Sequence, residues 1–277
     1  MISRKLRKTV QNTLRKYGYK LVKIPQTDSL QPYPYIRTFH IDNQNFDFWI
    51  ANETGILWYD RDSLETRNKE NDALLHLIQP GDRVLEIGCH HGFFTTQIAK
   101  KLLSGGFILA LEADAANAMI AQAQMNLNNL GSVCRVLHRA GADQPGTISM
   151  SAADGSNVHA CHPREAKTMD VQAVTGDQMA AEFGPFTVLK LDVEGFEEKV
   201  LAGCRTILKN KPRLALELHL DLMKTYGSSL QNIFEIIGIG NYTGKMLIWP
   251  DSDHLHPFDP SQIPPTEIIN VFLHPVS

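Results

Sequence analysis

Two acidic residues, Asp192 and Glu194, follow the largely apolar run 188–191, which predicts a short buried strand. In an open sheet of parallel strands, ligands bind beyond the carboxyl ends of the strands, so both side chains would face a ligand. A carboxylate in such a place can accept a proton from a reacting hydroxyl. Glu194 has a second interpretation, because a negative charge is also favourable at the start of the helix predicted over residues 196–208.

A histidine, His219, ends the next predicted strand, residues 214–219. If this strand lies beside the previous one, one register sets Lys190 against Glu217 and Asp192 against His219. The first pair would be an ion pair within the sheet. The second pair would place an imidazole beside a carboxylate at the ligand edge, which is a workable general base. A purely structural role is the alternative for a lone histidine at a strand end.

A glycine-containing turn follows the predicted strand 83–87 and leads into a helix predicted over residues 93–103. Gly88 and Gly92 are separated by three residues, and both allow the backbone to turn sharply and to approach a ligand closely. A dinucleotide site usually has the spacing G-x-G-x-x-G, which brings backbone amides to a pyrophosphate. The spacing found here favours a ligand without a pyrophosphate.

A further carboxylate, Glu112, ends the apolar run 107–111, the next predicted strand. A carboxylate at the tip of that strand can accept hydrogen bonds from both hydroxyls of a ribose. A glycine turn and a ribose-binding carboxylate, without a phosphate cradle, form the combination that an S-adenosylmethionine site needs.

The elements that must position these residues alternate between strands and helices from Arg83 onward, which predicts a doubly wound, mostly parallel sheet of the α/β class. Predicted helices cover residues 115–130 and 230–237. Residues 245–249 and 268–274 predict a final antiparallel pair, with a proline-rich loop over 251–265 between them. Seven strands are predicted in all: 83–87, 107–111, 133–137, 188–191, 214–219, 245–249 and 268–274.

The amino-terminal part predicts two additions to a catalytic domain over residues 80–277. Residues 1–24 read as an amphipathic helix with one basic face, which suits either an anionic membrane surface or a contact with protein. Residues 25–79 read as an extension with a hairpin and a helix near 63–78. Trp58 and Tyr59 lie in this extension, and we favour packing over a role in lining a substrate pocket.

The charge distribution argues against nucleic-acid binding. Residues 1–23 contain eight of the 27 basic residues and no acidic residue, which leaves 19 basic against 30 acidic residues elsewhere, a net charge of −11. No apolar run is long enough to span a bilayer, and no signal peptide is visible. The four cysteines lack C-x-x-C spacing and predict free thiols. We therefore expect a cytoplasmic protein, with a peripheral contact at the inner face of the membrane through residues 1–23 as one possibility.

The stretch 144–170 interrupts the alternation and predicts a loop over the active site, with an extra strand near 147–150. His159, Cys161 and His162 lie close together in it. Such residues can bind a metal ion, but no second ligand pair at finger-like spacing accompanies them, so we assign no metal site there.

Taken together, these motifs resemble the FkbM-type methyltransferase family. The resemblance covers roughly residues 80–220, and its most specific part is D-V-E-G-x-E at Asp192–Glu197, with L-x-G from Leu201 to Gly203. It implies a Rossmann-like class I methyltransferase fold, S-adenosylmethionine as the cofactor, and O-methylation of a sugar or another hydroxyl compound.

The resemblance also implies roles for individual residues. Glu86, Gly88 and Gly92 would hold the methionine part of the cofactor, Glu112 the ribose, and Asp192 and Glu194 would lie by the transferred methyl group. Family members often have Gly-Ala-Asn at the turn where this chain has Gly88-Cys89-His90, and we place Cys89 and His90 among the cofactor-binding residues.

Several alternatives remain open at this point. Asp192 is the first candidate for the proton acceptor and His219 the second, and a divalent ion bound through Asp192 could instead lower the pKa of the hydroxyl. The acceptor is a glycan or lipid-linked sugar, or else a soluble small molecule, in which case residues 1–23 would form a domain or dimer contact. A non-catalytic cofactor-binding protein with the same fold is the third reading.

Overall fold

The computed structural model describes residues 32–276 apart from four gaps, 42–43, 61–63, 152–167 and 250. The chain divides into two compact units, Met1–Pro32 and Tyr33–Ser277, and the description concerns the second. The predicted helix over residues 1–24 lies outside the described residues, as do His159, Cys161 and His162. The predictions that rest on them stay predictions.

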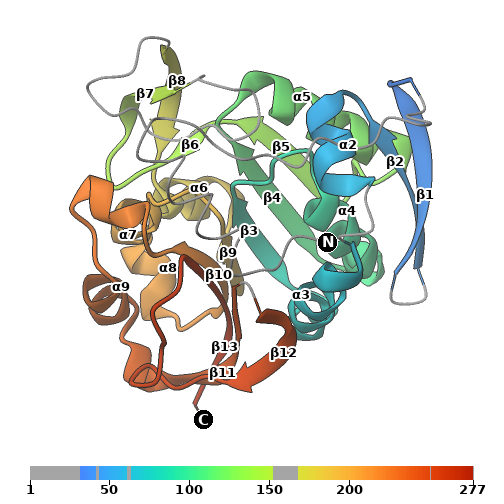
Figure 1. The fold of residues 1–277 in the computed structure, drawn as a ribbon. Helices are drawn as coiled ribbons and strands as arrows, with labels where there is room; N and C mark the ends of the chain where they lie inside the picture. Colours follow the sequence, from blue (N-terminus) through green and yellow to red (C-terminus); the bar gives the residue numbers. More distant parts are fainter. Residues whose placement is uncertain (1–31, 42–43, 61–63, 152–167, 250, 277) are drawn as a thin grey trace, which may run out of the picture. The chain divides into compact units, whose positions relative to one another are not determined.

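A mixed sheet of eight described strands forms the centre of this unit (Figure 1). The strands β5, β4, β3, β9 and β10 lie side by side in this order and run parallel. The sheet continues with β13, β11 and β12 through antiparallel pairs. The strands span Arg83–Ile87 (β3), Phe107–Glu112 (β4), Cys134–His138 (β5), Val188–Leu191 (β9), Arg213–His219 (β10), Tyr242–Ile248 (β11), Asp251–Pro257 (β12) and Ile268–Pro275 (β13).

The α/β class and the large sheet confirm the fold predicted from the alternation of strands and helices. The count of seven strands is wrong, because residues 251–257 were expected to be a loop and instead pair with β11. Five of the seven residues in that stretch are polar, so it lacks the apolar run that marks the inner strands.

Helices pack against both faces of the sheet, as a doubly wound fold requires. Buried side chains of α3, α4 and α5 meet one set of strand residues, and those of α6 to α9 meet another set. The helices span Glu53–Tyr59 (α2), Leu64–Leu77 (α3), Phe93–Lys101 (α4), Ala115–Leu127 (α5), Gly176–Phe183 (α6), Glu197–Ala202 (α7), Arg205–Lys209 (α8) and Leu230–Ile237 (α9). No described helix has the length and apolar character needed to cross a membrane.

One predicted helix is split in two. The expected helix over residues 196–208 is interrupted at Gly203, which separates α7 from α8. A Cβ atom on Gly203 would lie 2.0 Å from the carbonyl oxygen of Ala142, so the chain turns where another loop passes closely. The prediction of a continuous helix was wrong. The break depends on a contact with a residue distant in sequence, which a local pattern does not reveal.

The predicted hairpin is present as β1 (Tyr35–Ile41) and β2 (Gln44–Ile50). Side-chain amides from the last turn of α5 and from its C-cap residue take the place of a neighbouring strand along β2. Gln124 accepts from the backbone N–H of Trp49 at 2.8 Å and donates to its carbonyl at 2.9 Å, and Asn128 does the same for Asp47 at 3.0 and 2.7 Å. The hairpin is thereby fixed beside the helix that follows Glu112.

The part of the chain between β5 and α6 contributes a smaller sheet. Its strands lie in the order β6 (Ala140–Gly141), β8 (Thr168–Val174) and β7 (Gly146–Ser151). The extra strand predicted near 147–150 corresponds to β7. Thr175 begins α6 with a capping box, in which its hydroxyl accepts from Gln178 and the Gln178 side chain accepts from the Thr175 amide.

Candidate active site

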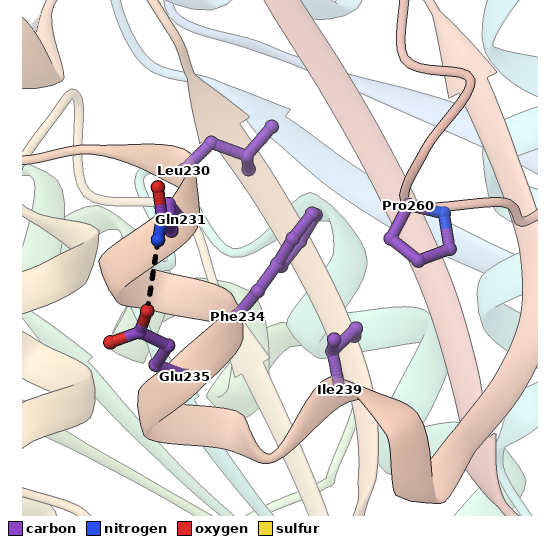
Figure 2. Close-up of a pocket in the computed structure, with 6 residues that line it drawn as sticks. All are labelled: Leu230, Gln231, Phe234, Glu235, Ile239 and Pro260. Carbon is purple, nitrogen blue, oxygen red and sulfur yellow. Dashed lines mark hydrogen bonds between the residues drawn. The ribbon is translucent and has the colours of Figure 1, made fainter.

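An apolar pocket of about 400 Å³ lies beside α9 (Figure 2). Its most polar feature is the hydrogen bond between Gln231 and Glu235, at 3.1 Å. No residue that the sequence singled out for chemistry lines it. Those residues gather instead at the carboxyl ends of β3, β4, β9 and β10. The pocket is lined by Leu230, Gln231, Phe234, Glu235, Ile239 and Pro260.

The turn after β3 depends on its two glycines for packing as well as for conformation. Gly88 has φ +87°, and a Cβ atom there would lie 1.7 Å from the carbonyl oxygen of Asp192. Gly92 has φ +80°, and its Cβ would lie 3.1 Å from the Cα of Ala121 in α5. The amide of Asp192 in turn donates to the carbonyl of Ile87 at 3.0 Å. The turn and the end of β9 are therefore held against each other.

The amides of the turn are already used within the protein. Those of Gly88 and Cys89 both donate to the carbonyl of Leu111, at 2.9 and 3.3 Å, and that of His90 donates to the carboxylate of Glu112 at 2.7 Å. These three successive N–H groups cannot also cradle a pyrophosphate. This use of the amides is in line with the glycine spacing, which favours a ligand without a pyrophosphate.

Glu112 lies at the tip of β4 and is buried. One carboxylate oxygen accepts from the amide of His90 and the other from the amide of Asp114, at 2.9 Å. Each oxygen keeps a lone pair, so the group can still accept from both hydroxyls of a ribose. Burial raises the pKa of Glu112 to about 7. The two backbone hydrogen bonds oppose this rise, and the charges of Asp114 and Asp192 add to it.

Glu86 is the partner of a buried lysine. It has no exposed surface, lies 3.0 Å from the Nζ atom of Lys190 on β9, and accepts a hydrogen bond from the Thr95 hydroxyl at 2.6 Å. Burial alone would lower the pKa of Lys190, but Glu86, and then Asp192, raise it. Lys190 is therefore the counter-charge of Glu86, and a cofactor contact by Glu86 stays a prediction.

The predicted register between β9 and β10 is wrong by two residues. Lys190 lies opposite Ala215, not Glu217, and opposite Glu86 on its other side. Asp192 is accordingly not opposite His219. A shift of two keeps every side chain on its original face, so His219 still comes close to Asp192.

Cys89 and His90 follow different directions from the same turn. Cys89 is buried beside Ala110 and Ala121, and burial raises the pKa of its thiol. A contact from Cys89 to a ligand would thus come from its backbone. His90 has φ +49°, and its Nδ1 lies 2.5 Å from the hydroxyl of Tyr59. Both residues remain predicted cofactor ligands.

Tyr59 joins the amino-terminal extension to the turn. It ends α2, is 5% exposed, and stacks on Phe93 with ring centroids 5.2 Å apart. The packing favoured for Tyr59 from the sequence is thus confirmed. Its hydroxyl also orients His90, whose ring stacks on His91 at 4.3 Å. Burial lowers the pKa of His91 to about 4, against the effects of Asn117 and Asp114, so His91 is neutral at pH 7.

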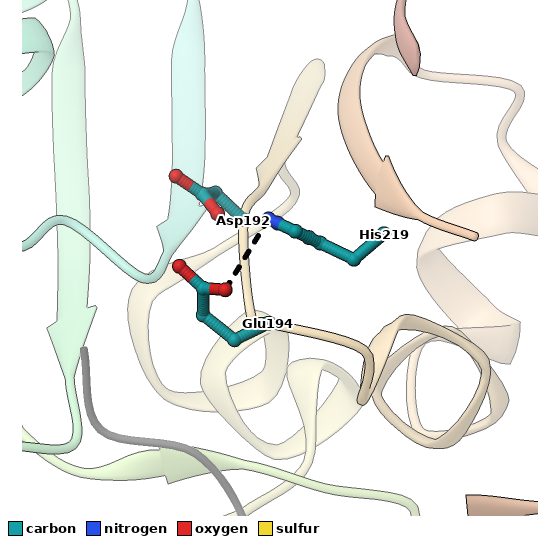
Figure 3. A group of neighbouring side chains, drawn as sticks. All are labelled: Asp192, Glu194 and His219. Atoms are coloured by element: carbon teal, nitrogen blue, oxygen red, sulfur yellow. Dashed lines mark ion pairs between the residues drawn. The ribbon is translucent and has the colours of Figure 1, made fainter. Parts of the chain in front are cut away.

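The three predicted catalytic residues form one cluster at the sheet edge. Asp192, Glu194 and His219 each offer a ligand atom, and these atoms lie within 4.8 Å of one another. Figure 3 shows the three side chains directed toward one another, with Nε2 of His219 3.4 Å from Oε2 of Glu194. His219 is buried, whereas the two acids are partly exposed.

His219 is held by Glu197, a residue that sequence reasoning placed in a motif without giving it a role. Its Nδ1 lies 2.9 Å from Oε1 of Glu197, which has no exposed surface and also accepts from the amide of Gly195 at 3.0 Å. Burial alone would lower the pKa of His219, but the Glu197 hydrogen bond, followed by the charges of Asp192, Glu194 and Glu217, raises it to about 10. The imidazole is then cationic at pH 7, which disfavours the predicted role of His219 as a general base and leaves Asp192 as the stronger candidate.

The comparison with family models identifies the class of protein. The sequence matches the Methyltransferase FkbM domain over residues 86–253. No curated protein matches it. Among solved structures, a putative rRNA-methylase from Clostridium thermocellum has 9% identity and a TM-score of 0.47, and covers 78% of this chain and 97% of its own. A putative O-methyltransferase from Klebsiella pneumoniae has 15% identity, a TM-score of 0.46, and coverages of 80% and 84%.

The family match makes the chain an S-adenosylmethionine-dependent methyltransferase with a Rossmann-like sheet, and S-adenosylmethionine is its cofactor. Within that class, the chain belongs to the FkbM methyltransferase family, whose domain matches more than half of its length.

Proposed function

We propose that this methyltransferase acts on a hydroxyl group of a sugar, a glycan or a lipid-linked saccharide. The observation that carries the proposal is the partly exposed carboxylate of Asp192, which follows β9. Its negative charge contributes to the raised pKa of Glu112, the candidate for ribose binding. When ionised, Asp192 and Glu194 can only accept hydrogen bonds, so they suit a substrate that carries several hydroxyl donors.

Different residues would have different roles in methyl transfer. S-adenosylmethionine, when bound, supplies a methyl group on a positively charged sulfur. Glu112 would hold the ribose, and the turn from Gly88 to Gly92 would lie along the methionine part. Asp192 would orient the acceptor oxygen and take its proton as the new oxygen–carbon bond forms, a contribution of about 10²–10⁴-fold. The products are a methyl ether, S-adenosylhomocysteine and a protonated Asp192.

An acceptor screen tests this function. Purified protein is incubated with S-adenosylmethionine and a panel of hydroxylated acceptors, from free sugars to lipid-linked saccharides, and S-adenosylhomocysteine is quantified. Turnover restricted to saccharide acceptors supports the proposal. Turnover only with other soluble hydroxyl compounds supports an O-methyltransferase of small molecules. Cofactor binding without any turnover supports a non-catalytic cofactor-binding protein.

The proposed membrane contact has its own test. The basic residues of 1–23 favour anionic vesicles, at about 1 kcal/mol for each basic group near the surface. We compare the full chain with a full-length variant in which Arg15, Lys16, Lys20 and Lys23 are replaced by Gln, by sedimentation with anionic liposomes. Equal sedimentation of both proteins would contradict the contact and favour a role of this segment in a domain or dimer interface.

A further inference from the structure

His219 is a buried side chain with one ring nitrogen in a hydrogen bond and the other directed into the site. It is 5% exposed, and its Nδ1 hydrogen-bonds to Glu197 at 2.9 Å. Its Nε2 points toward Asp192 and Glu194 (Figure 3). Its closest carboxylate contacts, to Glu194 at 3.4 Å and Glu217 at 3.9 Å, are ion-pair distances. The ring is thus buried, held through Nδ1 by Glu197, and directs Nε2 at the two carboxylates.

The separation of the three groups matches a coordination sphere better than a hydrogen-bonded cluster. Their candidate ligand atoms all lie within 4.8 Å of one another. Ligand atoms bound to one cation at about 2.0–2.4 Å lie roughly 3–4.8 Å apart, depending on the angle between them. Direct hydrogen bonds would instead bring the atoms to about 2.7–3.2 Å. A single ion could therefore contact all three groups with little rearrangement.

The surroundings of His219 follow the pattern of a metal-binding histidine. Such a residue usually donates its other ring N–H to a carboxylate, which fixes the ring orientation and the tautomer. Glu197 occupies that position and has no exposed surface. It is anchored in turn by the amide of Gly195 at 3.0 Å, so the orientation of the imidazole is built into the start of α7.

We propose that Asp192, Glu194 and His219 form a binding site for a divalent cation, with Glu197 as the residue that positions His219. Two carboxylates neutralise the charge of such an ion, and binding releases the Nε2 proton of His219, because only a neutral imidazole nitrogen can be a ligand. One imidazole together with carboxylate ligands suits a first-row ion such as Mn²⁺ better than Ca²⁺, which prefers oxygen ligands only. Three protein ligands leave coordination positions open for oxygen atoms of a second molecule.

The cation gives the site a defined role, which rests on the proposed function. The acceptor hydroxyl would occupy an open position, where the ion lowers the pKa of the hydroxyl and orients its oxygen. The hydroxyl proton then passes to the carboxylate oxygen of Asp192 that does not bind the ion. This arrangement favours acceptors with two adjacent hydroxyls, since both could bind the same ion.

Mn²⁺ binding, followed by electron paramagnetic resonance of the free ion, tests the site without any turnover. Wild-type protein should bind about one Mn²⁺ per chain. Glu194→Gln should weaken binding at least tenfold, and Glu197→Gln should weaken it about 10–100-fold although Glu197 would not touch the ion. Asp221→Asn, which changes an exposed acid paired with Lys224, is the matched control and should bind Mn²⁺ like the wild type.

Two results would overturn the proposal. One is the absence of stoichiometric Mn²⁺ binding by the wild type, and the other is equal Mn²⁺ binding by the wild type, Glu194→Gln and Glu197→Gln. Calorimetry with S-adenosylhomocysteine on the same samples shows that each variant is folded and separates this failure from failure of the proposed function. Cofactor binding and saccharide methylation that persist unchanged in EDTA would remove the cation alone. Specific Mn²⁺ binding without methylation of any saccharide would remove the proposed acceptor alone.

Discussion

The Nδ1 atom of His219 lies 2.9 Å from Oε1 of Glu197, a carboxylate with no exposed surface. This contact joins the end of β10 to the first turn of α7 at the edge where ligands bind. Because His219 also faces Glu194, it connects a fully buried acid to the partly exposed acids of the site. The imidazole is therefore better placed to organise these carboxylates than to take a proton from the acceptor.

Asp192→Asn should retain the fold and lose most of the methyl transfer. The amide keeps the size of the side chain but cannot accept the hydroxyl proton, so we expect kcat to fall by about 10²–10⁴-fold. Steady-state release of S-adenosylhomocysteine measures this change, and thermal unfolding checks the fold. Asp221→Asn is the control and should keep wild-type turnover. Near-normal kcat in Asp192→Asn would remove the role assigned to Asp192.

His219 should make the free energy of unfolding depend on alkaline pH. Its pKa in the folded protein is raised to about 10 from 6.5: burial acts to lower it, but Glu197 and the nearby carboxylates outweigh burial. The stabilisation by the charged imidazole is then fully present below pH 6.5 and is lost as pH rises toward 10. Urea unfolding in EDTA should show a steeper decline over this window for the wild type than for His219→Asn. Identical slopes would contradict the raised pKa.

Glu112 should make cofactor affinity depend on pH on the acidic side. The pKa of Glu112 is raised to about 7 by burial, whereas ribose hydroxyls donate to the ionised carboxylate. Binding then requires loss of a proton below pH 7, so the affinity for S-adenosylhomocysteine should fall by up to about tenfold per pH unit from pH 7 toward pH 5.5.

Calorimetry in EDTA, in buffers of different ionisation enthalpy, measures both the affinity and the released proton. Glu112→Gln is the matched variant and should bind more weakly, without this pH dependence. If the wild type releases no proton at pH 6, the carboxylate is either already ionised or not in contact with the ribose.

Gly88→Ala should disrupt the site even though it adds a single methyl group. The residue has φ +87°, which alone costs about 1–2 kcal/mol for a residue with a Cβ, and the new atom would lie 1.7 Å from the Asp192 carbonyl oxygen. We expect a loss of unfolding free energy above that cost, together with loss of cofactor binding. Gly131→Ala, where nothing lies within 4 Å, is the control and should change stability little. Wild-type stability and binding in Gly88→Ala would show that the turn does not pack against β9 as described.

The parts of the site that the sequence predicted depend on local signals. An apolar run followed by an acid at Glu112 or Asp192 marks a strand end, and parallel strands bring such ends to one edge. Fold class, turn and cluster could all be anticipated on that basis. The same logic placed His219 close to Asp192 in spite of the wrong register, because a shift of two residues preserves the face.

The parts that the sequence missed depend on contacts between distant residues. The partner of Lys190 is Glu86 on the strand before it in the sheet, and no local pattern distinguishes this pair from one with Glu217. The break at Gly203 comes from the carbonyl of Ala142. The role of Glu197 had one available signal, an acid within the D-V-E-G-x-E motif, but only the fold shows that it is buried against His219.

The central claim is that the turn from Gly88 to Gly92 and the carboxylate of Glu112 hold an adenosyl sulfonium cofactor. Isothermal titration calorimetry of the purified full chain with S-adenosylhomocysteine tests it most directly, with NAD titrated in parallel. We predict saturable binding of about one S-adenosylhomocysteine per chain, a clear loss of affinity in Glu112→Gln, and no heat with NAD. Binding of NAD together with no heat from S-adenosylhomocysteine would contradict the account.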